Sequence, residues 1–115
     1  VKTGDKVMIG GLVITGDASK SVLVRALGPS LADAGVSGTL NNPMVRLFNS
    51  SGVVIDSNDN WRSHPNSGSI PNHLLPKSEM EAAISTRLEP GAYTAIVTGV
   101  SDNEGVAIVE VYELE

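Results

Sequence analysis

A short polar stretch, residues 56–60 (DSNDN), carries the side chains best suited to bind a metal ion. Calcium takes roughly six to eight oxygen ligands and favours carboxylate and amide groups of this kind. An EF-hand is excluded because Trp61 stands where that loop needs glycine. The same side chains also favour Asx-turns, in which they accept hydrogen bonds from nearby backbone amides. The sequence therefore predicts a turn-rich loop start, with a calcium site as the alternative. The candidate ligands are Asp56, Asn58, Asp59 and Asn60.

The chain has two histidines, His64 and His73, and both fall in the polar segment that follows this stretch. Hydrolytic catalysis needs a nucleophile, a base and a group that orients the base. Ser30 lacks the Gly-x-Ser-x-Gly context of a nucleophile elbow. Histidines beside proline and asparagine in a loop are typically exposed polar residues. We therefore predict that the protein is not an enzyme and has no catalytic residues and no cofactor.

The segment 56–77 reads as one long surface loop containing Trp61, the single tryptophan of the chain. Long loops in compact domains are usually functional or fixed in place by packing. One buried indole can anchor many loop residues, so Trp61 is predicted to fix this loop structurally. A carbohydrate site in the loop is a further alternative, although sugar sites favour exposed aromatic side chains and Trp61 is the only one available.

The elements that position these residues are short strands rich in Val, Ile and Leu, which favour β-structure. Turn residues separate them, and 49–52 (NSSG) predicts a hairpin turn. We expect the last two strands to form a closing hairpin around 101–105. The predicted strands cover 7–15, 20–27, 44–48, 53–56, 93–100 and 106–114.

Two short helical segments are expected beside the strands. Ser30 can cap a single turn over 31–34, which Gly35 ends. Ser78 and Glu81 have capping-box spacing, and the following apolar residues lie at helical intervals. This second pattern predicts about two helical turns from Ser78 to Ile84, laid over a sheet.

Together these elements predict an all-β protein: one antiparallel β-sandwich of jelly-roll or Greek-key type spanning residues 1–115. About seven to eight strands and one or two very short helices are expected. Repeated amphipathic helices, which parallel βαβ units need, are missing. The core must be aliphatic, because the chain has only one Trp, two Tyr and one Phe.

Charge and composition limit the classes of partner that the protein is expected to bind. The formal net charge is −5, and the eight Lys and Arg residues are scattered, so no nucleic-acid surface is predicted. No apolar run has the length of a membrane span, so no membrane insertion is expected. The chain has no cysteine, which excludes disulfides and thiolate chemistry.

Five segments together resemble an uncharacterised module of large secreted and cell-surface proteins of bacteria. The Pro-Gly-x-Tyr turn is also similar to the bacterial pre-peptidase C-terminal sandwich domains. The resemblance implies a β-sandwich at an extracellular or cell-surface location, and it carries no established chemistry. The segments are 4–11 (GDKVMIGG), 24–31 (VRALGPSL), 58–62 (NDNWR), 90–97 (PGAYTAIV) and 109–112 (VEVY).

Two residues within these segments have predicted structural roles. The hydroxyl of Tyr93 can bond back to loop backbone, as in the tyrosine corner of Greek-key sandwiches. Arg25 interrupts an apolar strand, so an inward position requires a carboxylate partner, for which Asp56 and Asp59 are candidates. An edge or outward position of Arg25 is the alternative.

The sequence thus predicts a non-catalytic structural or adhesive module, whose partners are other copies of itself or neighbouring β domains. One alternative is a self-assembling subunit of an extracellular filament that uses edge or donated strands. A second alternative is a calcium- or carbohydrate-binding module.

Overall fold

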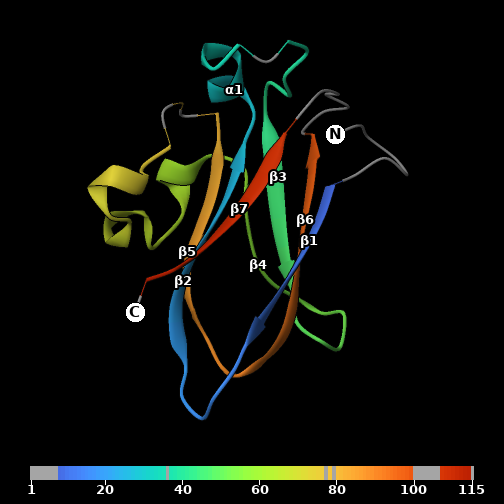
Figure 1. Cartoon of the computed structure of the whole chain (residues 1–115), viewed down its shortest axis with the longest axis vertical. Coiled ribbons are helices and arrows are strands. Elements are labelled where there is room, and N and C mark those ends of the chain that lie inside the picture. The colour runs from blue at the N-terminus through green and yellow to red at the C-terminus, as the bar shows by residue number, and fades with distance from the viewer. Residues whose placement is uncertain (1–7, 36, 77, 79, 100–106, 115) are drawn as a thin grey trace.

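Seven β-strands in two antiparallel sheets make up most of the molecule (Figure 1). The computed structural model describes residues 8–35, 37–76, 78, 80–99 and 107–114. The predicted class, an antiparallel β-sandwich, is confirmed. The strands are β1 (Met8–Ile14), β2 (Lys20–Leu27), β3 (Pro43–Phe48), β4 (Val54–Asn58), β5 (Ala82–Leu88), β6 (Gly91–Gly99) and β7 (Ile108–Glu113).

The four-stranded sheet has the order β1-β6-β3-β4, and the three-stranded sheet has the order β5-β2-β7. Among the described strands, only β3 and β4 are consecutive in the chain and also neighbours in a sheet. At each of the other connections, the next described strand lies in the opposite sheet. The strands of this sandwich are therefore held together mainly by contacts between residues far apart in the sequence.

The β3–β4 hairpin lies where the turn signal predicts it. The amide of Asn49 donates to the carbonyl of Val53 at 3.0 Å, and Gly52 adopts a positive φ of 78°. Glycine adopts this left-handed conformation without the steric cost that a side chain brings. A bulge between Leu47 and Phe48 shifts the register of the pair.

The predicted closing hairpin is wrong. β6 pairs with β1 and β3 in one sheet, whereas β7 pairs with β2 in the other. Each of these two strands gains an apolar inner face by joining a different layer, which a two-stranded hairpin could not provide. The residues predicted to form the hairpin turn, 101–105, lie outside the described part of the chain.

The predicted helix from Ser78 to Ile84 is also wrong, because the chain enters β5 at Ala82. The capping signal forms a tight turn instead: the amide of Glu81 donates to the carbonyl of Ser78 at 3.1 Å. Ladder bonds to β2 and burial on both faces of the sheet outweigh the weak helical preference of a few residues. The other predicted helical turn is present as α1 (Pro29–Asp33).

The main core lies between the two sheets and is aliphatic. β2 contributes alternate residues to it, and β3 and β6 face them from the opposite sheet. Dense packing of such side chains is the dominant stabilising contribution in a domain of this size. The buried members are Ile14, Val22, Val24, Ala26, Leu40, Val45, Leu47, Ala82, Ile84, Leu88, Ala95, Val97 and Ala107.

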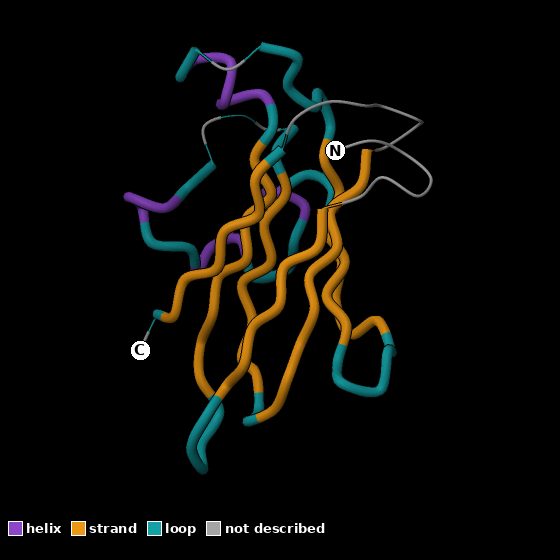
Figure 2. Tube along the Cα trace, turned by 45° about the vertical axis from the view of Figure 1, so that its right-hand side comes forward, coloured by secondary structure: helices purple, strands orange, loops and turns teal. Residues whose placement is uncertain are grey.

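A second apolar cluster covers the outer face of the three-stranded sheet. The segment between β4 and β5 folds into three 3₁₀ turns, η1 (Trp61–Ser63), η2 (Ser67–Ser69) and η3 (Asn72–Leu74). They form the purple and teal layer beside that sheet in Figure 2. Trp61 and Ile70 of this covering loop pack on Leu23 and Ala83 of the sheet. The central strand β2 is consequently buried on both faces.

Among the described helices, none is long and apolar enough to cross a membrane.

Candidate functional site

The polar side chains of interest gather around the covering loop, and Trp61 holds that loop in place. The indole is only 8% exposed, and its Nε1 donates to the carbonyl of Ser78 at 3.1 Å. The guanidinium of Arg62 lies over its ring, 4.8 Å from the centroid. Trp61 therefore occupies the anchoring position that the sequence predicts, and its face is not available as a sugar platform.

Arg25 lies on the loop-covered face of β2, and its partner is Glu110, not Asp56 or Asp59. The two residues are directly opposite each other on β2 and β7. Nε and Nη2 of Arg25 both donate to Oε1 of Glu110, the former at 3.1 Å. The guanidinium also donates to the hydroxyl of Tyr112 and to the carbonyl of Leu74, both at 3.0 Å. Arg25 thus ties the covering loop to two strands.

The end of the sandwich near α1 is closed by Glu81, which sequence reasoning missed. This residue has no exposed surface. Its Oε2 accepts hydrogen bonds from the amide of Gly28 at 3.0 Å and from the amide and hydroxyl of Ser30. A buried carboxylate with several donors is a strong structural contact. The spacing between Ser78 and Glu81 predicted a helix cap, so the buried position of this side chain was not expected.

The predicted calcium ligands point to partners within the protein. Oδ1 of Asn58 accepts from the amide of Ala83 at 3.0 Å, and its Nδ2 donates to the carbonyl of Asn60. The bond between Asn58 and Ala83 joins β4 to β5, which are edge strands of the two sheets. Oδ1 of Asp56 accepts from the amide of Ser57, and its Oδ2 contacts His64. Asp59 and Asn60 also have partners. Within the described residues, no three acidic or histidine side chains come together as a metal-binding group.

His64 is buried rather than exposed as its loop context predicts, with 5% of its surface accessible. Nδ1 accepts from the amide of Asn66 at 3.2 Å, so the proton resides on Nε2 and is donated to Asp56 at 3.0 Å. Both ring nitrogens are therefore engaged in holding the loop. His73 is exposed.

Tyr93 makes the predicted contact with loop backbone. Its hydroxyl donates to the carbonyl of Glu89 at 2.7 Å, across the turn that links β5 to β6. Gly91 in that turn has a φ of 151°.

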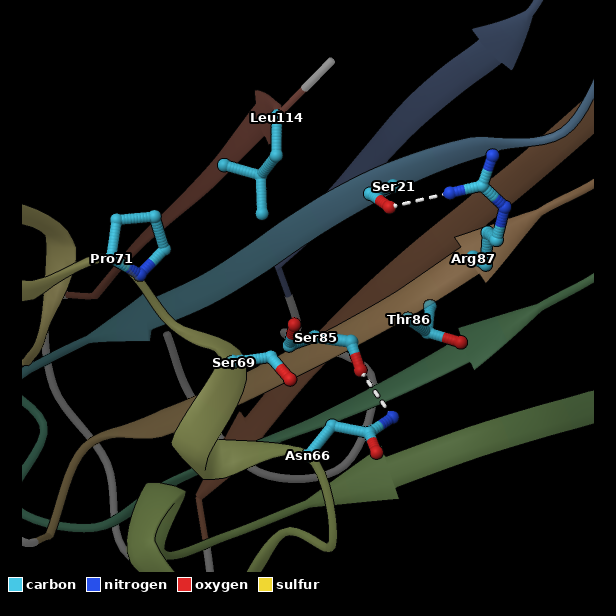
Figure 3. Close-up of a pocket in the computed structure, with 8 residues that line it drawn as sticks. All are labelled: Ser21, Asn66, Ser69, Pro71, Ser85, Thr86, Arg87 and Leu114. Atoms are coloured by element: carbon cyan, nitrogen blue, oxygen red, sulfur yellow. Dashed lines mark hydrogen bonds between the residues drawn. The ribbon is translucent and has the colours of Figure 1, made fainter.

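A polar cleft opens where the covering loop ends on the three-stranded sheet (Figure 3). Its volume is about 470 Å³. Leu23 pairs with Ser85, and Ser21 pairs with Arg87. Paired residues share a face of the sheet, and Leu23 faces the loop, so Ser21, Ser85 and Arg87 lie on that same face of the sheet. The lining residues are Ser21, Asn66, Ser69, Pro71, Ser85, Thr86, Arg87 and Leu114.

Hydrogen bonds keep the walls of this cleft in position. Nδ2 of Asn66 donates to the carbonyl of Ser85 at 2.8 Å, which fastens the loop to β5. The guanidinium of Arg87 donates to the hydroxyls of Ser19 and Ser21, both at 2.9 Å. The cleft thus has fixed donors and acceptors. This cleft has no signal in the sequence, because its residues come from four separate segments.

Comparisons with known proteins find no matching family, no similar curated protein and no similar solved structure.

Proposed function

We propose that the protein is a non-catalytic structural and adhesive module of a secreted or cell-surface bacterial protein. One observation carries the proposal: four buried or partly buried polar side chains that could have performed chemistry are committed to fastening the fold. Glu81 and Asn58 bond to backbone amides, and Arg25 and His64 each join the covering loop to another segment. Such a network stiffens a small sandwich, which suits a load-bearing or adhesive building block.

Adhesion of beads coated with the purified domain tests this proposal. Under shear flow, coated beads should stay attached to bacterial cells and to their extracellular matrix. Beads coated with heat-unfolded protein serve as the matched control, since they carry the same composition and charge. Equal detachment of both kinds of bead would contradict the adhesive role. Rapid proteolysis within residues 59–76 of the folded domain would contradict the stiffness on which the proposal depends.

Self-assembly into a filament is the second candidate, and exposed apolar residues on one sheet favour it. Ile9 and Val13 of the edge strand β1 are 62% and 67% exposed. They lie on the outer face of the four-stranded sheet, and Val54 lies at its other edge. Exposed edges and apolar surface of this kind promote association between copies.

Sedimentation analysis separates the second candidate from the first. A filament subunit should associate with rising concentration, and the double variant Ile9→Lys/Val13→Lys should remain a monomer, because charge on an edge strand opposes pairing. The variant Asp17→Lys, at an exposed turn outside the sheets, controls for net charge. A wild-type protein that stays monomeric at high concentration would exclude this candidate.

A further inference from the structure

We propose that the polar cleft beside the covering loop is a saccharide-binding site. It is formed by residues 66–71 on one side and by β2, β5 and Leu114 on the other (Figure 3). The biological setting of this site depends on the proposed adhesive role, and a saccharide is the partner proposed for it.

Ser85 provides the first argument. This residue lines the cleft and is only 6% exposed. Its side chain lies on the face of the sheet that the cleft exposes, because Ser85 pairs with Leu23. A hydroxyl group of a ligand in the cleft can exchange a hydrogen bond with the Ser85 hydroxyl, which both donates and accepts.

The remaining lining groups suit a ligand with many hydroxyls. Ser69 adds a second hydroxyl, which can donate as well as accept. The amide group of Asn66 also lines the cleft, and its Nδ2 donates to the carbonyl of Ser85 (Figure 3). Sugar hydroxyls likewise donate and accept, so a saccharide matches this mixture better than a ligand with one kind of group.

The shape and charge of the cleft also favour a saccharide. A volume of about 470 Å³ lies within the range of small-ligand sites. Pro71 and Leu114 supply apolar surface for the C–H face of a sugar ring. None of the lining residues within the described part of the chain is acidic, which disfavours a metal ion or a cationic ligand. Arg87 is held in a fixed orientation by Ser19 and Ser21, so an acidic sugar can use its guanidinium.

Titration of the ¹⁵N-labelled protein with two oligosaccharides tests the site, with maltohexaose as the neutral probe and a hexamer of galacturonic acid as the acidic probe. Amide signals of Ser69, Ser85 and Thr86 should shift with at least one probe. Ser85→Ala should weaken that binding about three- to tenfold, the effect of one lost hydrogen bond. Ser69→Ala should weaken it by a similar factor. If Ser85→Ala fails to fold, Ser69→Ala carries the test.

Matched controls make the outcome specific. Ser57→Ala removes an exposed hydroxyl from the other sheet and should leave both affinities unchanged. Arg87→Gln should weaken the acidic probe about tenfold and the neutral probe far less, because only the acidic sugar pairs with the guanidinium. Absence of shifts with either probe at millimolar concentration would overturn the inference, and so would shifts confined to residues outside the cleft.

This result is separable from the adhesive proposal. If neither oligosaccharide binds but coated beads still adhere, the cleft assignment fails and the adhesive role stands. If an oligosaccharide binds in the cleft but coated beads detach like the controls, the cleft assignment stands and the adhesive role fails.

Discussion

The backbone amide of Ser30 lies 2.9 Å from Oε2 of Glu81, and this contact joins the start of α1 to the start of β5. Ser30 and Glu81 are 51 residues apart in the sequence. The same oxygen accepts from Gly28 and from the Ser30 hydroxyl. One side chain therefore satisfies three donors at the point where the chain leaves the three-stranded sheet.

Replacement of Glu81 should destabilise the domain strongly. Glu81→Ala leaves three donors without their acceptor and should lower the free energy of unfolding by about 3 kcal/mol or more. Glu81→Gln retains one acceptor oxygen and should cost about 1–2 kcal/mol. Urea unfolding followed by circular dichroism measures both. The control, Glu89→Gln at an exposed position, should change stability by less than about 0.5 kcal/mol. An equally small effect of Glu81→Ala would contradict this role.

Gly28 should tolerate no side chain. A Cβ at this position would lie 2.0 Å from the carbonyl oxygen of Leu40, which is backbone and cannot rotate away. Gly28→Ala is therefore expected to cost about 3 kcal/mol or more in unfolding free energy. Gly68→Ala is the matched control, because no atom lies within 4 Å of the added methyl group there. Similar melting temperatures for the two variants would show that this close approach is not rigid.

Removal of the indole should loosen the covering loop. Trp61→Ala should cost about 3–5 kcal/mol, because it empties the centre of the second apolar cluster. Trp61→Phe keeps most of the packing but loses the bond to Ser78, so about 1 kcal/mol is expected. Hydrogen exchange of the amides in 61–75 should accelerate in Trp61→Ala, while exchange in β6 should change little. Unchanged exchange in the loop would contradict the anchoring role.

Arg25 and Glu110 should be energetically coupled. Arg25→Lys replaces the planar guanidinium by a single ammonium group, which cannot donate to Glu110, Tyr112 and Leu74 at the same time. We expect a loss of about 1–2 kcal/mol from this change. A double-mutant cycle with Arg25→Met and Glu110→Gln should give a coupling energy near 1 kcal/mol. Additive effects of the two substitutions would mean that the ion pair is not stabilising.

Calcium should leave stability unchanged. Asn58 and Asp56 already bond to Ala83, Asn60, Ser57 and His64, so binding of a cation would require breaking those contacts. Millimolar calcium should not raise the melting temperature, whereas a ligand that binds the folded state raises it by mass action. A clear increase that chelation reverses would restore the calcium interpretation of residues 56–60.

The sequence predicts the strand class well, because β-branched residues and turn signals are local information. It predicts β5 poorly. Alternation normally identifies a strand, but Ala82 to Ser85 are all buried, since the covering loop hides the outer face of that sheet. Without alternation, the helical spacing of Met80, Ala83 and Ile84 gave the stronger local signal.

The partner of Arg25 could not be predicted from nearby residues in the sequence, for a similar reason. Arg25 and Glu110 meet because β2 and β7 are neighbours, and they are 85 residues apart in the chain. The carboxylates predicted from the sequence were Asp56 and Asp59 instead. The cleft could not be predicted either, since it exists only where the loop stops covering the sheet.

The covering loop makes the two broad sides of the sandwich unequal. One side is sealed by its own chain, while the other presents bare strands with Ile9 and Val13 open to solvent. Stacking through the bare strand faces can therefore join only two copies, and it ends once both bare faces are covered. The two covered sides of such a pair would point outward, so this surface by itself favours a two-fold dimer and a longer row would need contacts through the strand edges.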